Sequence, residues 1–300
     1  MLVPVMLGVS FIIFLMLYLV PGDPVAMILG DTATPEAAAA LRQELGLDAP
    51  FFIQFFRWIW NLVVNFDLGT SFFGNRSVSA EIMSRLPATA QLAGLSILVA
   101  IVIGVPIGII SAIKQYSIFD NVSMFFALLG VSMPNFWQGL LLVWLFALTL
   151  NGLLPSSGWT SWQHMILPTV TLATGSMANI ARMTRSSMLE IIRQDYIKTA
   201  RAKGQIERKI IFKHALKNAL IPIITAIGLQ FGNLLGGAVL TETIFSIPGI
   251  GRLMIDAIGQ RDYPIVQGTV LFIALTFSLI NLIVDILYSY ADPRIKSAYK

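Results

Sequence analysis

The sequence lacks cysteine and is poor in charged residues. The absence of cysteine excludes disulfide frameworks, Cys-based metal sites and thiol chemistry. Charged residues make up 12% of the chain and hydrophobic residues 56%, against about 25% and roughly 45–50% in soluble domains. Because so few charges cannot cover the surface of a 300-residue globule, we expect lipid to cover most of it.

The motifs of several enzyme classes are also missing. There is no Gly-x-x-x-x-Gly-Lys-[Ser/Thr] loop, so we expect the chain not to hydrolyse ATP itself. There is no His-Glu-x-x-His or Gly-x-Ser-x-Gly motif. The two histidines, His164 and His214, are expected on opposite faces of the membrane. We therefore expect no catalytic residue, no metal site and no cofactor in this chain.

Six apolar segments are long enough to be predicted as membrane-spanning helices. They are 1–20, 86–113, and approximately 121–148, 165–185, 218–240 and 266–288. A cleaved signal peptide is the alternative for the first segment, but that segment has no basic leader and no small-x-small cleavage site. Pro134 would kink the third segment or, alternatively, divide it into two short helices.

These segments predict an all-α polytopic membrane protein with four parts. A first transmembrane helix (1–20) precedes an extracytoplasmic loop (21–86), a five-helix core (87–290) and a cytoplasmic tail (291–300). The long loop carries a helical pattern over 35–45. It also carries an aromatic stretch at 51–58, which we expect to be an interfacial helix with its rings at the level of the lipid headgroups.

The basic residues predict that both termini are cytoplasmic. Lys114, ten residues between 182 and 217 and three in the tail make up fourteen of the twenty Lys and Arg residues, and all lie on one predicted side. Four of the remaining six lie in the long 21–86 loop, where the positive-inside rule is weak. No basic residue precedes the first span, and a missing short basic leader would account for this. Since topology explains the net charge of +4, we expect no nucleic-acid partner.

The most informative segment is Asp195–Gly204, within the basic loop 186–217. Asp195 fits a helix N-cap and Gly204 fits a helix stop. A second helical pattern then runs from Ile206 into the fifth span. This segment is either a solvated basic loop beside anionic lipid or a lever that moves the spans when a partner pushes on it.

Small and polar residues mark the fifth and sixth spans. Gly228, Gly232 and Gly236, with Gly237 beside them, recur at a four-residue spacing that allows close helix approach. They are interpreted either as packing inside one subunit or as a seam against a partner subunit. The candidates for lining a transport pathway are Gln230, Asn233 and Asn281, because polar side chains at this depth usually face protein or a water-filled cavity.

The run Thr199-Ala200-Arg201-Ala202-Lys203-Gly204, followed by His214, Asn218 and Pro222, resembles the coupling-helix (EAA) loop of ATP-binding-cassette (ABC) importer permeases. It most resembles the dipeptide/oligopeptide/nickel branch. Matching motifs cover nearly the whole chain: Pro21-Gly22-Asp23-Pro24, Asp67-Leu68-Gly69-Thr70-Ser71, Arg85-Leu86-Pro87, Thr184-Arg185-Ser186-Ser187-Met188, Gln230-Phe231-Gly232, Leu235-Gly236-Gly237, Phe245, Pro248-Gly249-Ile250-Gly251 and Arg261-Asp262-Tyr263-Pro264. The general motif opens with Glu-Ala-Ala where this chain has Lys198-Thr199-Ala200. An acidic contact from position 198 is therefore not expected.

The resemblance implies a type I (MetI-like) permease fold in the bacterial inner membrane. It implies four kinds of partner: a second homologous permease subunit, two ATPase subunits that bind ATP and Mg, an extracytoplasmic solute-binding protein, and membrane lipid. The ATPase subunits would grip the helix that ends at Gly204, with Thr199, Ala200, Arg201, Ala202, Lys203 and His214 in the coupling region. Cargo would be di- or oligopeptides, with nickel, glutathione or oligosaccharide as alternatives.

The outer segment between the last two spans is predicted to be a capping hairpin or a lid over the pathway. The residues assigned to this gate, or to contact with the binding protein, are Glu242, Pro248, Gly249, Arg261 and Asp262. Two other classes fit less well. An ion-coupled secondary transporter would have intramembrane acidic residues and inverted repeats, and an intramembrane protease would have a nucleophile–base pair.

Overall fold

The computed structural model describes residues 2–20, 23–30, 34–74 and 76–291, and over these the chain is helical, without a named strand. The predicted all-α class is confirmed. Two compact units divide the chain: residues 1–89 with 248–276, and residues 90–247 with 277–300. These units cut across the four parts expected from the sequence, because two long helices, α5 (Val78–Ile113) and α14 (Tyr263–Ala291), contribute to both. Of the predicted tail, 291–300, only Ala291 lies in the described part.

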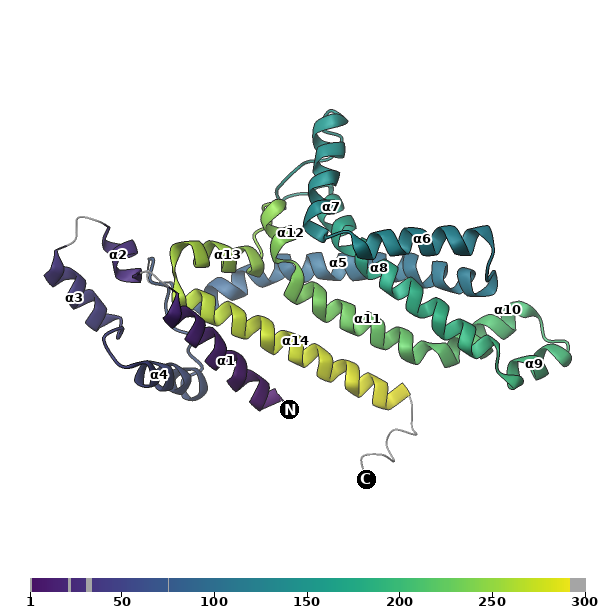
Figure 1. Cartoon of the computed structure of the whole chain (residues 1–300), viewed down its shortest axis with the longest axis horizontal. Helices are drawn as coiled ribbons and strands as arrows, with labels where there is room; N and C mark the ends of the chain where they lie inside the picture. Colours follow the sequence, from purple (N-terminus) through teal and green to yellow (C-terminus); the bar gives the residue numbers. More distant parts are fainter. Residues whose placement is uncertain (1, 21–22, 31–33, 75, 292–300) are drawn as a thin grey trace, which may run out of the picture. The chain divides into compact units, whose positions relative to one another are not determined.

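The first unit contains the N-terminal helices and the predicted outer loop (Figure 1). Its elements are α1 (Leu2–Leu19), α2 (Pro24–Leu29), α3 (Pro35–Glu44), α4 (Phe51–Val64), α13 (Ile250–Gln260) and the first parts of α5 and α14. The helix expected over 35–45 is confirmed as α3. Thr34 caps it by accepting a hydrogen bond from the Ala37 backbone N–H at 3.3 Å, and Pro35 occupies its first position.

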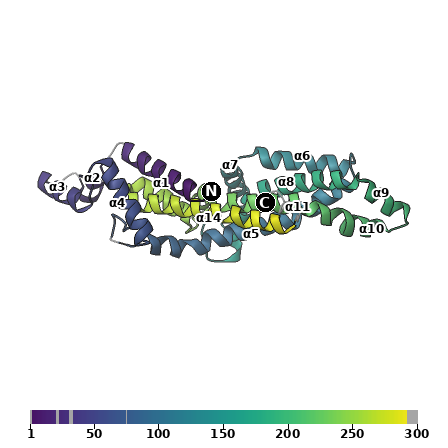
Figure 2. The ribbon, with the colours of Figure 1, turned by 90° about the horizontal axis from the view of Figure 1, so that it is seen from below.

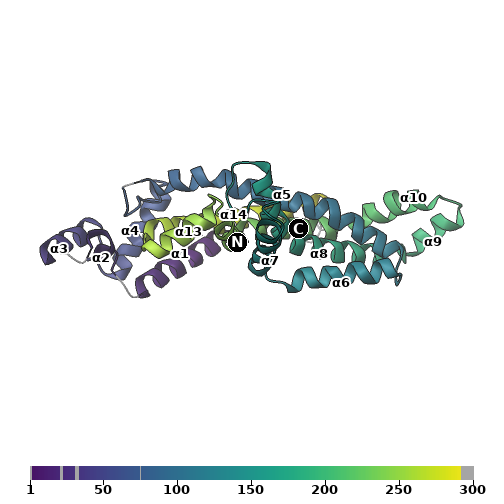
Figure 3. The same ribbon diagram turned by 90° about the horizontal axis from the view of Figure 1, so that it is seen from above.

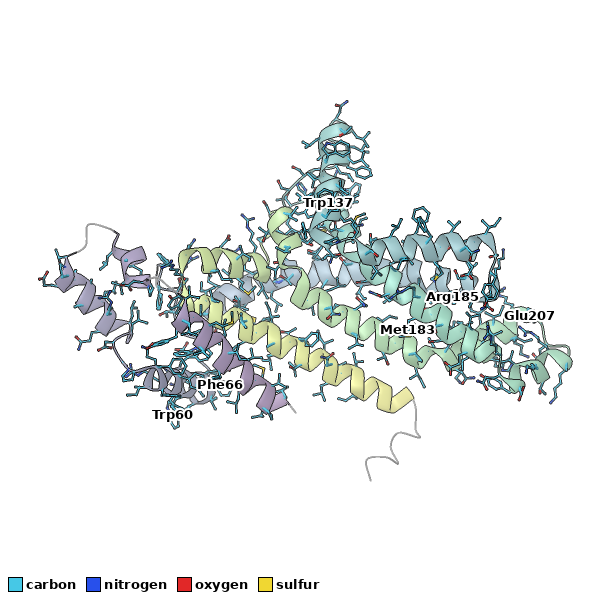
Figure 4. All side chains as sticks on the ribbon, in the orientation of Figure 1. Trp60, Phe66, Trp137, Met183, Arg185 and Glu207 are labelled. Carbon is cyan, nitrogen blue, oxygen red and sulfur yellow. The ribbon has the colours of Figure 1, made fainter. Side chains whose placement is uncertain are left out.

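The aromatic stretch at 51–58 is also confirmed as helical, and α4 extends it to Val64. One face of α4 packs on α1, where the Phe14 ring lies 5.3 Å from the Phe51 ring and 5.4 Å from the Phe55 ring, centroid to centroid. The other face carries Phe56 and Trp60, each 65% exposed. Trp60 is labelled in Figure 4. The interfacial position expected for this helix stays a prediction.

Two motifs that lie far apart in the sequence meet in the first unit. Asp262 is buried, and its carboxylate accepts hydrogen bonds from the Ser71 hydroxyl and, at 3.2 Å, from the Phe72 backbone N–H. Arg261, just before it, ends α13 in the left-handed conformation with φ 57°. The Asp67–Ser71 and Arg261–Pro264 motifs therefore fix a turn inside this unit.

The second unit is built around α8. Its other elements are α6 (Ile118–Ser132), α7 (Asn135–Leu142), the π-helices η1 (Val143–Thr149) and η2 (Ile210–Leu216), α8 (Trp162–Ile192) itself, α9 (Asp195–Ala202), α10 (Glu207–Lys209), α11 (Lys217–Gly237), α12 (Val239–Ile244) and the remaining parts of α5 and α14. The helices α6 and α11 pack on opposite sides of α8 (Figures 1 and 2).

The third predicted span is not one kinked helix. The chain breaks at Met133 and Pro134, and the helices on either side of the break, α6 and the run from α7 into η1, are bent by 103°. Viewed from above, α7 is seen nearly end-on while α6 lies in the plane of the picture (Figure 3). The alternative, that Pro134 divides the segment into two short helices, is confirmed, because proline removes a backbone donor and its ring clashes with the preceding turn.

The count of six spans stays a prediction. Within the described residues, four helices are long and apolar enough to cross a membrane, or five if the bent pair counts as one span. Those four lie in α1, α5, the run from α10 into α11, and α14. The predicted span 165–185 falls inside α8, which has 31 residues but does not meet the same test of composition.

Glycines set the closest helix contacts of the second unit. A Cβ added to Gly108 of α5 would lie 2.5 Å from the Thr184 Cβ and 2.6 Å from the Ala181 carbonyl oxygen of α8. A Cβ added to Gly104, one turn earlier, would lie 2.8 Å from the Met177 carbonyl oxygen. The backbones of α5 and α8 therefore touch along a four-residue glycine spacing that the sequence reading overlooked.

The same geometry recurs between α11 and α14. Added Cβ atoms would lie 2.1 Å from Val284 at Gly228 and 3.2 Å from Phe277 at Gly232. These two glycines pack inside one chain, as one of the two interpretations held. Gly236 is half-buried in α11. Gly237 is the last residue of α11, and its surroundings lie outside the described part.

A buried ion pair joins α6 to α8. The Arg185 Nε and Nη2 atoms donate to the two carboxylate oxygens of Asp120 at 2.6 and 2.7 Å, and the Tyr116 backbone N–H adds a third bond at 2.9 Å. Asp120 is 1% exposed and Arg185 23% exposed. This two-point geometry fixes the orientation of α8 against the start of α6 more tightly than a single-contact pair would.

We expect Gly108→Val to destabilise the fold, because its side chain would force α5 and α8 apart. Overpacking of this kind costs about 1–3 kcal/mol, and the purified chain in detergent should show a lower Tm. The matched control is Gly94→Ala on the same helix, where an added Cβ meets nothing within 4 Å. It should raise stability by about 0.5–1 kcal/mol through helix propensity. Equal Tm values for the two variants would contradict the close contact.

Candidate functional site

The predicted coupling helix is α9, and one buried side chain fastens it to the second unit. Ile197 is 0% exposed and packs in a single apolar cluster. The cluster contains Ile109 and Ala112 of α5, Met188 of α8, Ile210, Ile211 and Ala215 of η2, and Ala219 and Ile223 of α11. Complete burial of an isoleucine side chain stabilises a contact by about 1.5–3 kcal/mol. The ends of three long helices are therefore tied to this short one.

Gly204 stops α9 as expected from the sequence. The Gly204 N–H donates to the Arg201 carbonyl at 2.9 Å, and the Gln205 N–H donates to the Ala200 carbonyl at 3.2 Å. These two bonds form a Schellman motif, which requires a left-handed residue at this position. Gly204 has φ +73°, and an added Cβ there meets nothing within 4 Å. Glycine is thus needed for its backbone conformation rather than for space inside this chain.

The start of α9 differs by one residue from the expectation. Gln194, not Asp195, is the N-cap, and it makes no side-chain capping bond. Asp195 lies in the first turn, where a carboxylate favours the positive end of the helix dipole. Lys198 Nζ donates to Asp195 Oδ1 at 2.9 Å, and this bond lowers the pKa of the Asp195 carboxyl.

An exposed ion pair spans the turn that follows α9. Arg201 Nε and Nη2 donate to the two carboxylate oxygens of Glu207 at 2.7 and 3.3 Å. Both residues are exposed, and Glu207, labelled in Figure 4, is the first residue of α10. The pair spans the Gly204 turn, so it holds α9 against the helix that follows.

His214 takes part in the hydrogen bonds around α9 through its backbone carbonyl. Its carbonyl accepts a hydrogen bond from the Asn218 Nδ2 at 2.8 Å, and the same Nδ2 lies 3.0 Å from the Tyr196 hydroxyl of α9. His214 itself lies in the π-helix η2, which connects the α9 loop to α11. Asn218 therefore bonds both α9 and the π segment.

The face of α9 opposite the buried Ile197 is exposed to solvent. The exposed residues of the predicted coupling set are Thr199, Arg201, Ala202, Lys203 and Gly204, while Ala200 is half-buried. Tyr196 (45%) and Ile206 (69%) expose large side chains on either side of them. One side of the segment is thus anchored in the unit, and the other offers a mixed basic and apolar surface.

A second feature is a groove between α8 and α11, with a volume of about 720 Å³. Its lining residues are Asn179, Arg182, Met183 and Ser186 of α8 and Pro222, Thr225, Ala226, Leu229 and Gln230 of α11. In each helix these positions follow the spacing of a single helix face. Figure 4 shows Met183 toward α11 and Arg185 toward α6, so the two sides of α8 do different things.

The three pathway candidates separate in the structure. Gln230 lines the groove and accepts a hydrogen bond from the Ser176 hydroxyl at 3.3 Å. Asn233 is exposed one turn further along α11. Asn281 does not line the groove, and its buried Oδ1 has no hydrogen-bond partner among the described residues. A role in transport stays a prediction for all three.

The predicted gate residues are mostly buried. In the second unit, Glu242 of α12 is fully buried, and its carbonyl accepts from the Ile247 N–H at 2.8 Å. Phe245, close to Glu242 in α12's C-terminal turn, is also buried. Its ring packs close to α7: a Cβ added to Gly139 would lie 3.2 Å from it. In the first unit, Pro248 is exposed, Gly249 is buried at the N-cap of α13, and Arg261 and Asp262 form the turn described above. Their roles as gate or contact residues stay predictions.

Sequence reasoning missed two arrangements of side chains in the second unit. The Asp120–Arg185 pair joins residues 65 apart, so no local pattern reveals it. The sequence identified only one residue of the groove as a pathway candidate. Gln230 was a candidate, whereas Arg182 was counted simply among the ten basic residues between 182 and 217. The i, i+3, i+4, i+7 spacing of Asn179, Arg182, Met183 and Ser186 is the signal that could have identified the face.

Comparison with known proteins agrees with this geometry. Residues 104–297 match the family described as binding-protein-dependent transport system inner membrane component, and residues 1–93 match the N-terminal region of such components. The chain is 49% identical to the dipeptide transport system permease protein DppB of Alkalihalophilus pseudofirmus, over 99% of this chain and 97% of that protein. It is 44% identical to the glutathione transport system permease protein GsiC of Salmonella paratyphi A, over 98% and 96% of the two chains.

Solved structures show the same fold. The inward-facing MetNI methionine ABC transporter gives a TM-score of 0.59 at 19% identity, covering 71% of this chain and 97% of that one. An amino acid ABC transporter with histidines gives 0.55 at 18%, covering 72% and 94%. The expected type I (MetI-like) permease fold is confirmed. The chain belongs to the family of inner-membrane components of binding-protein-dependent transport systems.

Proposed function

We propose that this chain is a membrane-spanning subunit of an ATP-driven importer of short peptides in the bacterial cytoplasmic membrane. The observation that carries the proposal is the anchoring of α9. Ile197 is fully buried against the ends of α5, α8 and α11, while the opposite face of α9 is exposed. A force applied to that face is passed to three long helices together.

The proposed assembly contains two ATPase subunits, a second homologous permease and an extracytoplasmic binding protein. Each ATPase subunit, with ATP and Mg, would receive a coupling helix in a cleft. Closure of the two ATPases would turn the helices and expose the pathway alternately to the two sides. The excess of basic residues on one predicted side supports a cytoplasmic position for α9 and both termini.

Short peptides are the proposed cargo because relatives of this chain are named as peptide permeases. The 49% identity to a dipeptide permease protein, over nearly the full chain, is the main support. Glutathione, itself a tripeptide, is the second candidate, supported by the 44% identity to a glutathione permease protein.

Uptake by proteoliposomes tests the proposal. We expect vesicles that contain this chain, its partner permease, both ATPases and the binding protein to accumulate labelled dipeptide when ATP is supplied. An imposed ion gradient without ATP should give no uptake. Accumulation that follows the ion gradient and ignores ATP would rule out the proposed importer.

We expect Gly204→Val to reduce peptide uptake in these vesicles about tenfold while ATP hydrolysis continues. A β-branched residue is strained at φ +73° by roughly 1–2 kcal/mol, so the Schellman turn should open and α9 should lose its fixed position. The measurement is the number of peptides taken up per ATP hydrolysed.

Gly204→Asn is the matched control, because asparagine tolerates the left-handed conformation. It should retain most of the coupling. Full coupling in the Gly204→Val variant would remove the mechanical role assigned to this turn.

A further inference from the structure

The groove between α8 and α11 is lined by a basic residue, Arg182, whose charge no described carboxylate balances. Arg182 is exposed in the groove, and its Nη2 donates to the Asn179 Oδ1 at 3.1 Å. No carboxylate among the described residues forms an ion pair with it. Since a guanidinium has five N–H donors, most of its hydrogen-bonding capacity remains available.

Arg185, one turn further along α8, shows what a structural arginine looks like in this unit. It is largely buried, and both branches of its side chain bond Asp120 at 2.6 and 2.7 Å. Arg182, in contrast, is exposed and forms no ion pair with a described residue. It lines the groove beside α11, whereas Arg185 bonds α6. Arg182 lies near the cytoplasmic end of the predicted span 165–185, where an arginine generally faces a water-filled cavity or a substrate or ion pathway.

The surroundings of Arg182 fit a small polar molecule with an anionic end. The groove volume of about 720 Å³ falls in the range of small-molecule sites, about 300–1,000 Å³. Asn179 orients the guanidinium, while Ser186, Thr225 and Gln230 add uncharged polar groups. The planar fork of an arginine matches a carboxylate in two-point geometry.

We infer that Arg182 binds the C-terminal carboxylate of the peptide as it passes through the groove. This inference rests on the proposed function, and it adds a requirement that the cargo carries a free carboxylate. Asn179 is a positioning residue, and the apolar side chains of Met183 and Leu229 contact the less polar part of the peptide. Substrates without an anionic end are expected to lack this contact.

A charge-selective labelling experiment tests the site directly. The chain has no cysteine, so Ser186→Cys introduces a single thiol one turn from Arg182. The assembled importer in nanodiscs is treated with an anionic or a cationic methanethiosulfonate, and modification of this chain is timed. We expect the anionic reagent to be preferred, and Arg182→Gln to lower the ratio of the two rates about tenfold, as expected for loss of a nearby unit charge in a partly hydrated groove.

Two further variants serve as controls. Arg182→Lys should keep most of the preference, because it keeps the charge. Arg208→Gln removes a positive charge from exposed α10, away from the groove, and should leave the ratio unchanged. A ratio that Arg182→Gln does not change, or that Arg208→Gln lowers equally, would overturn the inference.

Protection by ligand identifies what Arg182 binds. A dipeptide with a free C-terminus should slow labelling at position 186, its C-terminal amide should not, and Arg182→Gln should abolish the difference. Equal protection by both peptides would overturn the inference. So would an anionic preference that is present in phosphatidylcholine nanodiscs and lost in phosphatidylglycerol nanodiscs, because an anionic lipid headgroup would then be the ligand of Arg182.

Uptake measured in parallel separates the two proposals. If the wild-type importer accumulates dipeptide with ATP but the charge ratio does not respond to Arg182→Gln, only the carboxylate site fails. If no peptide is taken up under any condition, the proposed function fails and the assignment of a peptide carboxylate fails with it.

Discussion

The burial of Ile197 is the interaction on which the proposed coupling mechanism depends. A helix of eight residues is too short to be stable alone in water, so α9 exists as a helix because its apolar side is taken up by other elements. Those elements are the ends of α5, α8 and α11 together with the π segment η2. Any rigid displacement of α9 must therefore displace helices that run through the body of the unit, or expose an isoleucine and its neighbours.

A five-residue stretch of α8 connects this anchor to the other helices. Thr184 packs against the backbone of α5 at Gly108, Arg185 bonds Asp120 of α6, and Met188 lies in the Ile197 cluster. Each contact is of a kind that tolerates little sliding: a backbone approach without room for a Cβ, a two-point ion pair, and a fully buried side chain. The motif Thr184–Met188 thus joins α5, α6, α8 and α9, and the groove that contains Arg182 lies on the remaining face of α8.

Sequence patterns correctly predicted the features that depend on residues close together in the chain. The helices α3 and α4, the stop at Gly204 and the helical run into α11 follow from periodicity, capping residues and the conformational freedom of glycine. The predicted N-cap of α9 differs by one residue from the observed one, because aspartate is favoured both at the N-cap and in the first turn of a helix. Pro134 allowed either a kink or a break, and the 103° bend depends on packing of α7 against α8 and α12 that no local signal contains. The Asp120–Arg185 pair, the contact of Gly104 and Gly108 with α8, and the α8–α11 groove all join distant residues. Local spacing could mark the helix faces involved, but it does not show which helix each face packs against.

The measurement that tests the central claim most directly is a cross-link from the exposed face of α9. In the assembled importer, Ala202→Cys provides one thiol in an otherwise cysteine-free chain. If α9 is the surface on which the motor acts, a short thiol–amine cross-linker should join this chain to an ATPase subunit, and the yield should change when ATP is bound. Cross-links to the extracytoplasmic binding protein, or none to either ATPase subunit in any nucleotide state, would contradict the account.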